Sequence, residues 1–144
     1  VGRLQSQSTS NPTSISQKAA IAALRGDQSC VHRMVSEFDE RRKLIIARAS
    51  KCFEIEIQPP SGAFYLFVNV SGLFGSRYND TEIRSASDLA HYLLDEARVA
   101  LVPGEAFGAR DYVRLSYATS REIINEGMSR ITEAVRQLRK GTKS

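Results

Sequence analysis

Residues 99–120 read VALVPGEAFGARDYVRLSYATS, an order that predicts a strand, a loop with glycines, a second strand and the start of a helix. Side chains of a strand alternate between its two faces, so Val113, Leu115 and Tyr117 share one face of the second strand. This apolar face predicts a buried core. Arg114 lies on the opposite face and is expected to point away from the core, toward solvent or toward another domain.

Length and composition limit the class of protein. The chain has 144 residues, the size of one ordinary domain, and its 42% hydrophobic and 25% charged residues are typical of a globular fold. The net charge of +4 comes from basic residues interleaved with acidic ones, a pattern that does not favour nucleic-acid binding. Because no apolar run approaches the ~20 residues of a membrane span and no signal peptide is visible, we expect a cytoplasmic protein without a membrane partner.

The two cysteines support the same compartment. Cys30 and Cys52 flank one predicted helix. At ~1.5 Å of rise per residue they would lie about 30 Å apart, too far for a disulfide, which needs Cα atoms within ~7 Å. We therefore expect thiols in a reducing environment.

The remaining chain predicts further elements around these two strands. Asn11 is expected to cap a helix over residues 12–24, which Gly26 ends, after a loop or linker over residues 1–14. Further helices are expected over residues 27–50, from residue 87, and after a capping box formed by Thr119 and Glu122. The last of these helices carries a narrow apolar stripe suited to packing on a sheet: Ile124, Met128, Ile131, Val135 and Leu138. Residues 53–57 and 63–70 predict neighbouring antiparallel strands, the second covered on both faces. The sum is one α/β domain: a small, mostly antiparallel sheet covered by helices, with an additional N-terminal segment.

Few residues are candidates for chemistry. His32 and His91 fall inside predicted helices, and the sequence lacks a nucleophile elbow, a zinc-protease pair and a phosphate loop. The loop PGEAFG (residues 103–108) lacks the strand-to-helix context of a dinucleotide site, so it is interpreted as a shaped connection that lets Phe107 tuck under the sheet. No catalytic residue and no metal site is predicted.

Arg114 has two possible interpretations. It could be a polar-face residue paired with a nearby Asp or Glu. Alternatively, its planar guanidinium could bind a carboxylate through two parallel hydrogen bonds, with a charge that does not depend on pH.

Four motifs in a fixed order resemble a known family. They are QSQSTSNP (residues 5–12), PSGAFY (60–65), VPGEAFG (102–108) and YVRLSYA (112–118). Together they are similar to the C-terminal part of class I pyridoxal-phosphate aminotransferases, closest to the aspartate and aromatic subgroup. The resemblance implies the small domain of a fold-type I enzyme. Such enzymes are homodimers that move an amino group between an amino acid and a 2-oxo acid on pyridoxal 5'-phosphate.

The resemblance also implies roles for individual residues. In the matching Arg-Leu-Ser-Tyr-Ala motif the arginine binds the substrate α-carboxylate, which implies this role for Arg114. The Ser-Asn-Pro segment implies that Ser10 and Asn11 lie near the dimer interface and the neighbouring subunit's site.

One part of the family pattern is missing. The family needs a Ser-Lys motif whose lysine forms a Schiff base with the cofactor, and this chain has no such motif. The chain is therefore expected to be part of a longer enzyme, with a lead-in segment at residues 1–26 and the small domain at residues 27–144. By itself it is expected to be inactive and to bind no pyridoxal phosphate.

A second hypothesis belongs to a different class. The chain could be a standalone, non-catalytic α/β module whose polar face around Arg114 binds an acidic partner or a small carboxylic acid. The amino donor is not specified by the sequence.

Overall fold

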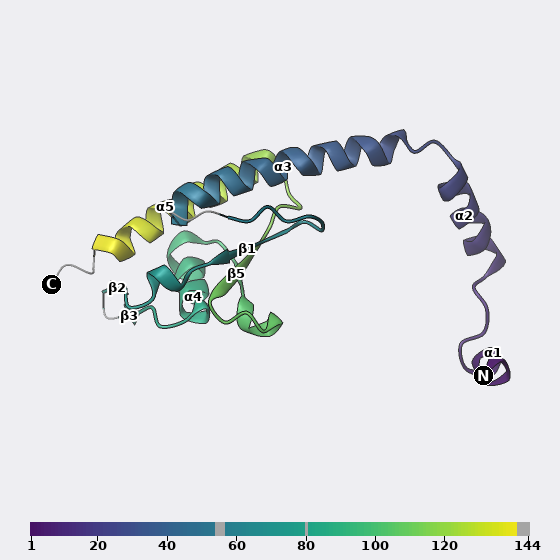
Figure 1. Ribbon diagram of the computed structural model, residues 1–144, viewed down its shortest axis with the longest axis horizontal. Helices are drawn as coiled ribbons and strands as arrows, with labels where there is room; N and C mark the ends of the chain where they lie inside the picture. The colour runs from purple at the N-terminus through teal and green to yellow at the C-terminus, as the bar shows by residue number, and fades with distance from the viewer. Residues whose placement is uncertain (54–56, 80, 141–144) are drawn as a thin grey trace. The chain divides into compact units, whose positions relative to one another are not determined.

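The computed structural model describes residues 1–53, 57–79 and 81–140, and the chain forms two compact units, Val1–Ser36 and Glu37–Ser144 (Figure 1). The first unit is helical. It holds α1 (Gly2–Ser8), α2 (Ser14–Arg25) and the first turns of α3 (Ser29–Phe53). Neither α1 nor α2 has a buried residue, so their apolar side chains lie on the surface.

The start of the chain differs from its prediction in two ways. Residues 2–8 form a helix where a loop was expected, and the Thr9 hydroxyl closes it by donating to the Gln5 carbonyl at 3.0 Å. Thr13, not Asn11, caps α2, because its Oγ1 accepts a hydrogen bond from the Ser16 N–H at 3.3 Å. The predicted end of this helix at Gly26 is confirmed.

The second unit is built on a three-stranded antiparallel sheet in the order β1-β5-β4. Its elements are, in chain order, α3, β1 (Tyr65–Asn69), η1 (Ser71–Leu73), β2 (Arg77–Tyr78), β3 (Thr81–Glu82), α4 (Ala86–Ala97), β4 (Val102–Pro103), η2 (Gly104–Phe107), β5 (Tyr112–Ser116) and α5 (Arg121–Lys140). β2 and β3 pair in a separate two-stranded sheet. The predicted fold class, a small antiparallel sheet with helices, is confirmed.

One hydrophobic core joins this sheet to its helices. The buried side chains of β1 and β5 share that core with residues of α3, α4 and α5. The predicted stripe of α5 is confirmed, since all five members are buried: Ile124, Met128, Ile131, Val135 and Leu138. α5 runs alongside the second half of α3 in Figure 1, and Arg121 of α5 forms an ion pair with Glu37 of α3 at 2.6 Å.

Of the two neighbouring strands predicted, the first was wrong. The second is confirmed as a strand, β1, but neither its pairing with the first nor its burial on both faces is. Phe53 belongs to α3 and is buried in the core, which excludes a strand starting there; residues 54–56 lie outside the described residues. β1 instead pairs with β5, and only one of its faces is buried, because Phe67 is 38% exposed. One face of β1 therefore packs in the core, whereas Phe67 on its other face leaves apolar surface exposed.

Two helix caps lie beside their predicted positions. Ser85 caps α4, accepting a hydrogen bond from the Asp88 N–H at 3.1 Å, while the Asp88 carboxylate accepts one from the Arg84 N–H at 2.9 Å. Ser120 caps α5 by accepting from the Ile123 N–H at 3.3 Å, so the predicted capping box at Thr119 was wrong. No helix in the described ranges is both long enough and apolar enough to cross a membrane.

Candidate functional site

Arg114 lies in the middle of the central strand of the sheet. It pairs with Phe67 of β1 on one side and with Val102 of β4 on the other. Its strand neighbours Val113 and Leu115 are buried on the core side, whereas Arg114 is partly exposed on the other side. We call this side, which carries Arg114, Phe67 and Val102, the open face of the sheet. The predicted direction of Arg114 is confirmed.

Two aromatic rings cover the guanidinium of Arg114. Its Cζ lies 4.2 Å from the ring centroid of Tyr65 and 4.5 Å from that of Phe107. Both distances are within the ~6 Å at which a cation is attracted by a ring face. Phe107 is in turn contacted edge-to-face by Phe67, with 5.7 Å between the ring centroids. The open face therefore holds a cation within a cluster of aromatic side chains.

The loop before β5 places Phe107 in this cluster. A side chain at Gly104 would put its Cβ 2.1 Å from the Ala109 carbonyl oxygen, so only glycine fits there. Gly108 follows η2 with φ of +74°, in the left-handed region that glycine adopts readily. The loop is a shaped connection, as predicted, but Phe107 does not tuck under the sheet: it is 48% exposed and lies over Arg114.

No carboxylate neutralises Arg114 among the residues that the structure describes. The carboxylates on α3 pair elsewhere: Glu37 binds Arg121 and Arg41, and the Arg121 guanidinium holds the pKa of Glu37 down, to about 2. The interpretation of Arg114 as one half of an internal ion pair is therefore wrong for the described part of the chain. Its N–H groups are available to a ligand.

Ser10 and Asn11 lie between α1 and α2 in the first unit. Both are exposed, and Ser10 has φ of +55°, in the left-handed region. They belong to the first compact unit, whereas Arg114 belongs to the second. Their place near a dimer interface stays a prediction.

The described lysine side chains do not suit a Schiff-base anchor. Lys18 and Lys51 are exposed on helices. Lys43 forms ion pairs with Asp39 at 2.8 Å and Glu40 at 3.0 Å, and these carboxylates raise its pKa, which disfavours the neutral amine that a Schiff base requires. The lysines whose side chains the structure describes therefore do not suit the covalent attachment of pyridoxal phosphate. His32 and His91, which the sequence places inside helices, are likewise exposed on α3 and α4.

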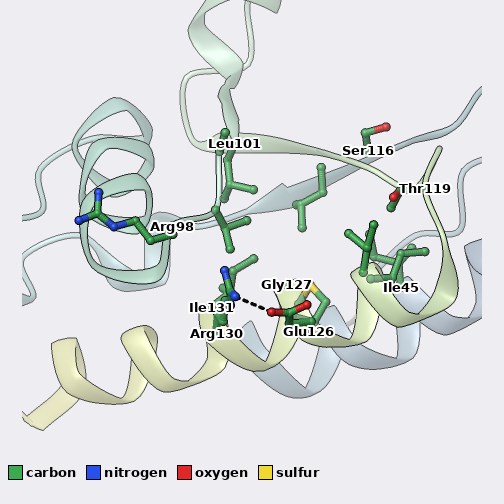
Figure 2. Close-up of a pocket in the computed structure, with 15 residues that line it drawn as sticks. Ile45, Arg98, Leu101, Ser116, Thr119, Glu126, Gly127, Arg130 and Ile131 are labelled. Carbon is green, nitrogen blue, oxygen red and sulfur yellow. Dashed lines mark hydrogen bonds and ion pairs between the residues drawn. The ribbon is translucent and has the colours of Figure 1, made fainter.

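A cavity of about 300 Å³ lies between α5 and the segment that leads into β4 (Figure 2), and Arg114 is not among the residues that line it. Apolar side chains line most of it, including Leu101 and Ile131. Arg130 and Glu126 of α5 also line it and are joined as an ion pair. Arg98 is the third charged residue of a lining that is otherwise mostly apolar, so the cavity offers mainly apolar packing surface.

Tyr65 and Phe107 were not predicted as site residues. Alternation along β1 puts Tyr65 and Phe67 on one face, but the nearly continuous apolar run was interpreted as buried on both sides. The pairing of β1 with β5 is what brings Tyr65 next to Arg114. That pairing joins segments far apart in the sequence, and no local pattern predicts it.

Comparison with known proteins points to one family. Residues 1–131 match the family described as aminotransferase class I and II. The chain is 45% identical over 136 residues to a probable aspartate/prephenate aminotransferase of Rickettsia typhi, covering 94% of this chain and 34% of that protein. It is 47% identical over 131 residues to the aspartate/prephenate aminotransferase of Nitrosomonas europaea, covering 89% of this chain and 33% of that protein.

Solved structures agree with these relatives. The fold is similar to the aspartate aminotransferase from Rhizobium meliloti, with a TM-score of 0.86 and 38% identity, covering 94% of this chain and 34% of that one. It is also similar to an aromatic aminotransferase from Pyrococcus horikoshii, with a TM-score of 0.81 and 33% identity, covering 96% of this chain and 35% of that one. The chain thus spans about a third of the length of the relatives that it matches.

Proposed function

Because the chain belongs to the class I and II aminotransferases, we propose that it is part of an enzyme that moves an amino group between an amino acid and a 2-oxo acid, and that Arg114 binds the substrate α-carboxylate. The observation that carries this proposal is a partly exposed arginine, on a central strand paired on both sides, with no acidic partner in the described part of the chain. Such a group can bind a carboxylate through two parallel hydrogen bonds without first breaking an internal ion pair.

The substrate class follows from the relatives. The two relatives named above are aspartate/prephenate aminotransferases. The two similar solved structures are an aspartate aminotransferase and an aromatic aminotransferase. We propose that the full-length enzyme uses aspartate or an aromatic amino acid as amino donor. The carboxylate role of Arg114 applies to either donor, because every α-amino acid carries that group.

The cofactor of the full-length enzyme would be pyridoxal 5'-phosphate, which supplies the electron sink for transamination when bound. The described lysines do not suit its covalent attachment, so we propose that its anchoring lysine lies outside residues 1–144. In this proposal residues 1–26 are a lead-in segment and residues 27–144 the small domain of a cytoplasmic homodimer, with Ser10 and Asn11 near the neighbouring subunit's site. The chain alone would be inactive.

Replacement of the arginine tests the proposal. In the full-length enzyme, Arg114→Ala is expected to lower kcat/KM for aspartate and for phenylalanine alike, by an amount equivalent to about 2–5 kcal/mol, because a charged hydrogen-bonded pair is lost. Arg110→Ala is the matched control: this arginine lies on the exposed loop before β5 and contacts no described aromatic ring. Unchanged kinetics for Arg114→Ala would refute the carboxylate role.

A further inference from the structure

Building on the proposed function, we infer that Tyr65 and Phe107 are positioning residues: they hold the Arg114 guanidinium in one orientation on the open face, with its N–H groups free for a carboxylate. The two ring centroids lie 4.2 and 4.5 Å from its Cζ. Both residues act through Arg114 and not on the substrate.

An arginine side chain is flexible, and its orientation has to be fixed by contacts. Its long chain of rotatable bonds gives the free side chain many rotamers. In many sites an Asp or Glu fixes the guanidinium, but no such partner is present for Arg114 in the described ranges. The rings of Tyr65 and Phe107 are the contacts that remain to restrict its motion.

Aromatic contacts leave the hydrogen-bonding groups of Arg114 unused. A ring attracts the cation through its negative face, and that face carries no oxygen or nitrogen atom that could accept a conventional hydrogen bond. The five N–H donors of arginine therefore stay open to a carboxylate. A carboxylate partner would occupy two of these donors and would compete with the ligand. The aromatic cluster therefore orders the guanidinium and leaves its N–H donors unoccupied.

The rings are themselves held in place. Phe107 contacts Phe67 edge-to-face at 5.7 Å between ring centroids, and Tyr65 lies 4.5 Å from the ring centroid of Phe64. Tyr65 is fixed by the pairing of β1 with β5, whereas Phe107 is fixed by the tight turn at Gly104. Two independent segments of the chain thus converge on one guanidinium.

Nuclear magnetic resonance of the full-length enzyme, labelled with ¹⁵N at arginine, tests the positioning directly. Ring currents from both aromatic side chains are expected to shift the Arg114 Nε–H proton upfield. Phe107→Leu and Tyr65→Leu should each remove part of this shift, whereas Tyr65→Phe should retain it because the ring remains. Tyr112→Leu is the matched control, since it removes a ring from the same side of β5 that makes no described contact with Arg114. An Nε–H shift that no Leu variant changes would overturn the inference.

Kinetics of the full-length enzyme test the consequence for binding. Phe107→Leu and Tyr65→Leu are each expected to lower kcat/KM for aspartate about 3- to 20-fold, mainly through KM, with Tyr65→Phe close to the wild type. If Arg114→Ala is impaired but both Leu variants match the wild type, the positioning role is overturned and the carboxylate role stands. If Arg114→Ala also matches the wild type, both are overturned.

Discussion

Gly104→Ala is the substitution with the most direct structural consequence in this chain. The added Cβ would lie 2.1 Å from the carbonyl oxygen of Ala109 and 2.6 Å from that of Tyr112, and both obstacles are backbone atoms that no side-chain rotation can move. The backbone would have to shift by roughly 1 Å, and overpacking of this kind costs about 1–3 kcal/mol or more. We expect a loss of about 3 kcal/mol, because the shift involves both η2 and the first residue of β5.

Urea denaturation followed by circular dichroism measures this loss. Gly72→Ala is the matched control, since no heavy atom lies within 4 Å of its added Cβ, and it should stay within about 0.5 kcal/mol of the wild type. Gly108→Ala should fall between the two, at about 1–2 kcal/mol, because its φ of +74° is left-handed but its surroundings are open. A Gly104→Ala variant as stable as Gly72→Ala would refute the steric argument.

Two further predictions concern stability. Glu37 ionises with a folded-state pKa of about 2, below its ordinary 4.5, so its ion pair with Arg121 stabilises the fold fully above pH 4.5 and is lost as the pH falls toward 2. The difference in unfolding free energy between the wild type and Glu37→Gln should therefore shrink from pH 5 to pH 2 in urea titrations; a constant difference would contradict this. Leu93→Ala should lower the free energy of unfolding by about 2–5 kcal/mol, because Leu93 is fully buried. Leu94→Ala is the control and should lower it far less, since Leu94 is 46% exposed. Equal midpoints of thermal unfolding for the two variants would exclude Leu93 from the core.

The parts of the fold that the sequence predicts well are those set by local periodicity. The stripe on α5 and the direction of Arg114 each depend on the repeat of a single element, and both are confirmed. The family resemblance is confirmed for the same reason: its motifs can be recognised without knowledge of the tertiary contacts.

The helix caps were predicted wrongly where two neighbouring residues can cap the same helix at nearly equal energy. Thr119 and Ser120 both have a hydroxyl that can cap a helix, and so do Ser85 and Ser87, so packing decides which one is used. The aromatic contacts of Arg114 are beyond local prediction for a different reason. They require β1 and β5 to pair in one register, and that pairing depends on the whole core.

The register of β5 links the candidate site to the core. β5 is paired on both sides, and Val113 and Leu115, which flank Arg114, are buried. A slip of one residue would send the arginine into the core and both apolar neighbours into water. A register that misplaces Arg114 would therefore also disrupt the core and destabilise the domain. Selection for stability alone would keep the arginine on its correct side, even in a copy of this domain that no longer served any reaction.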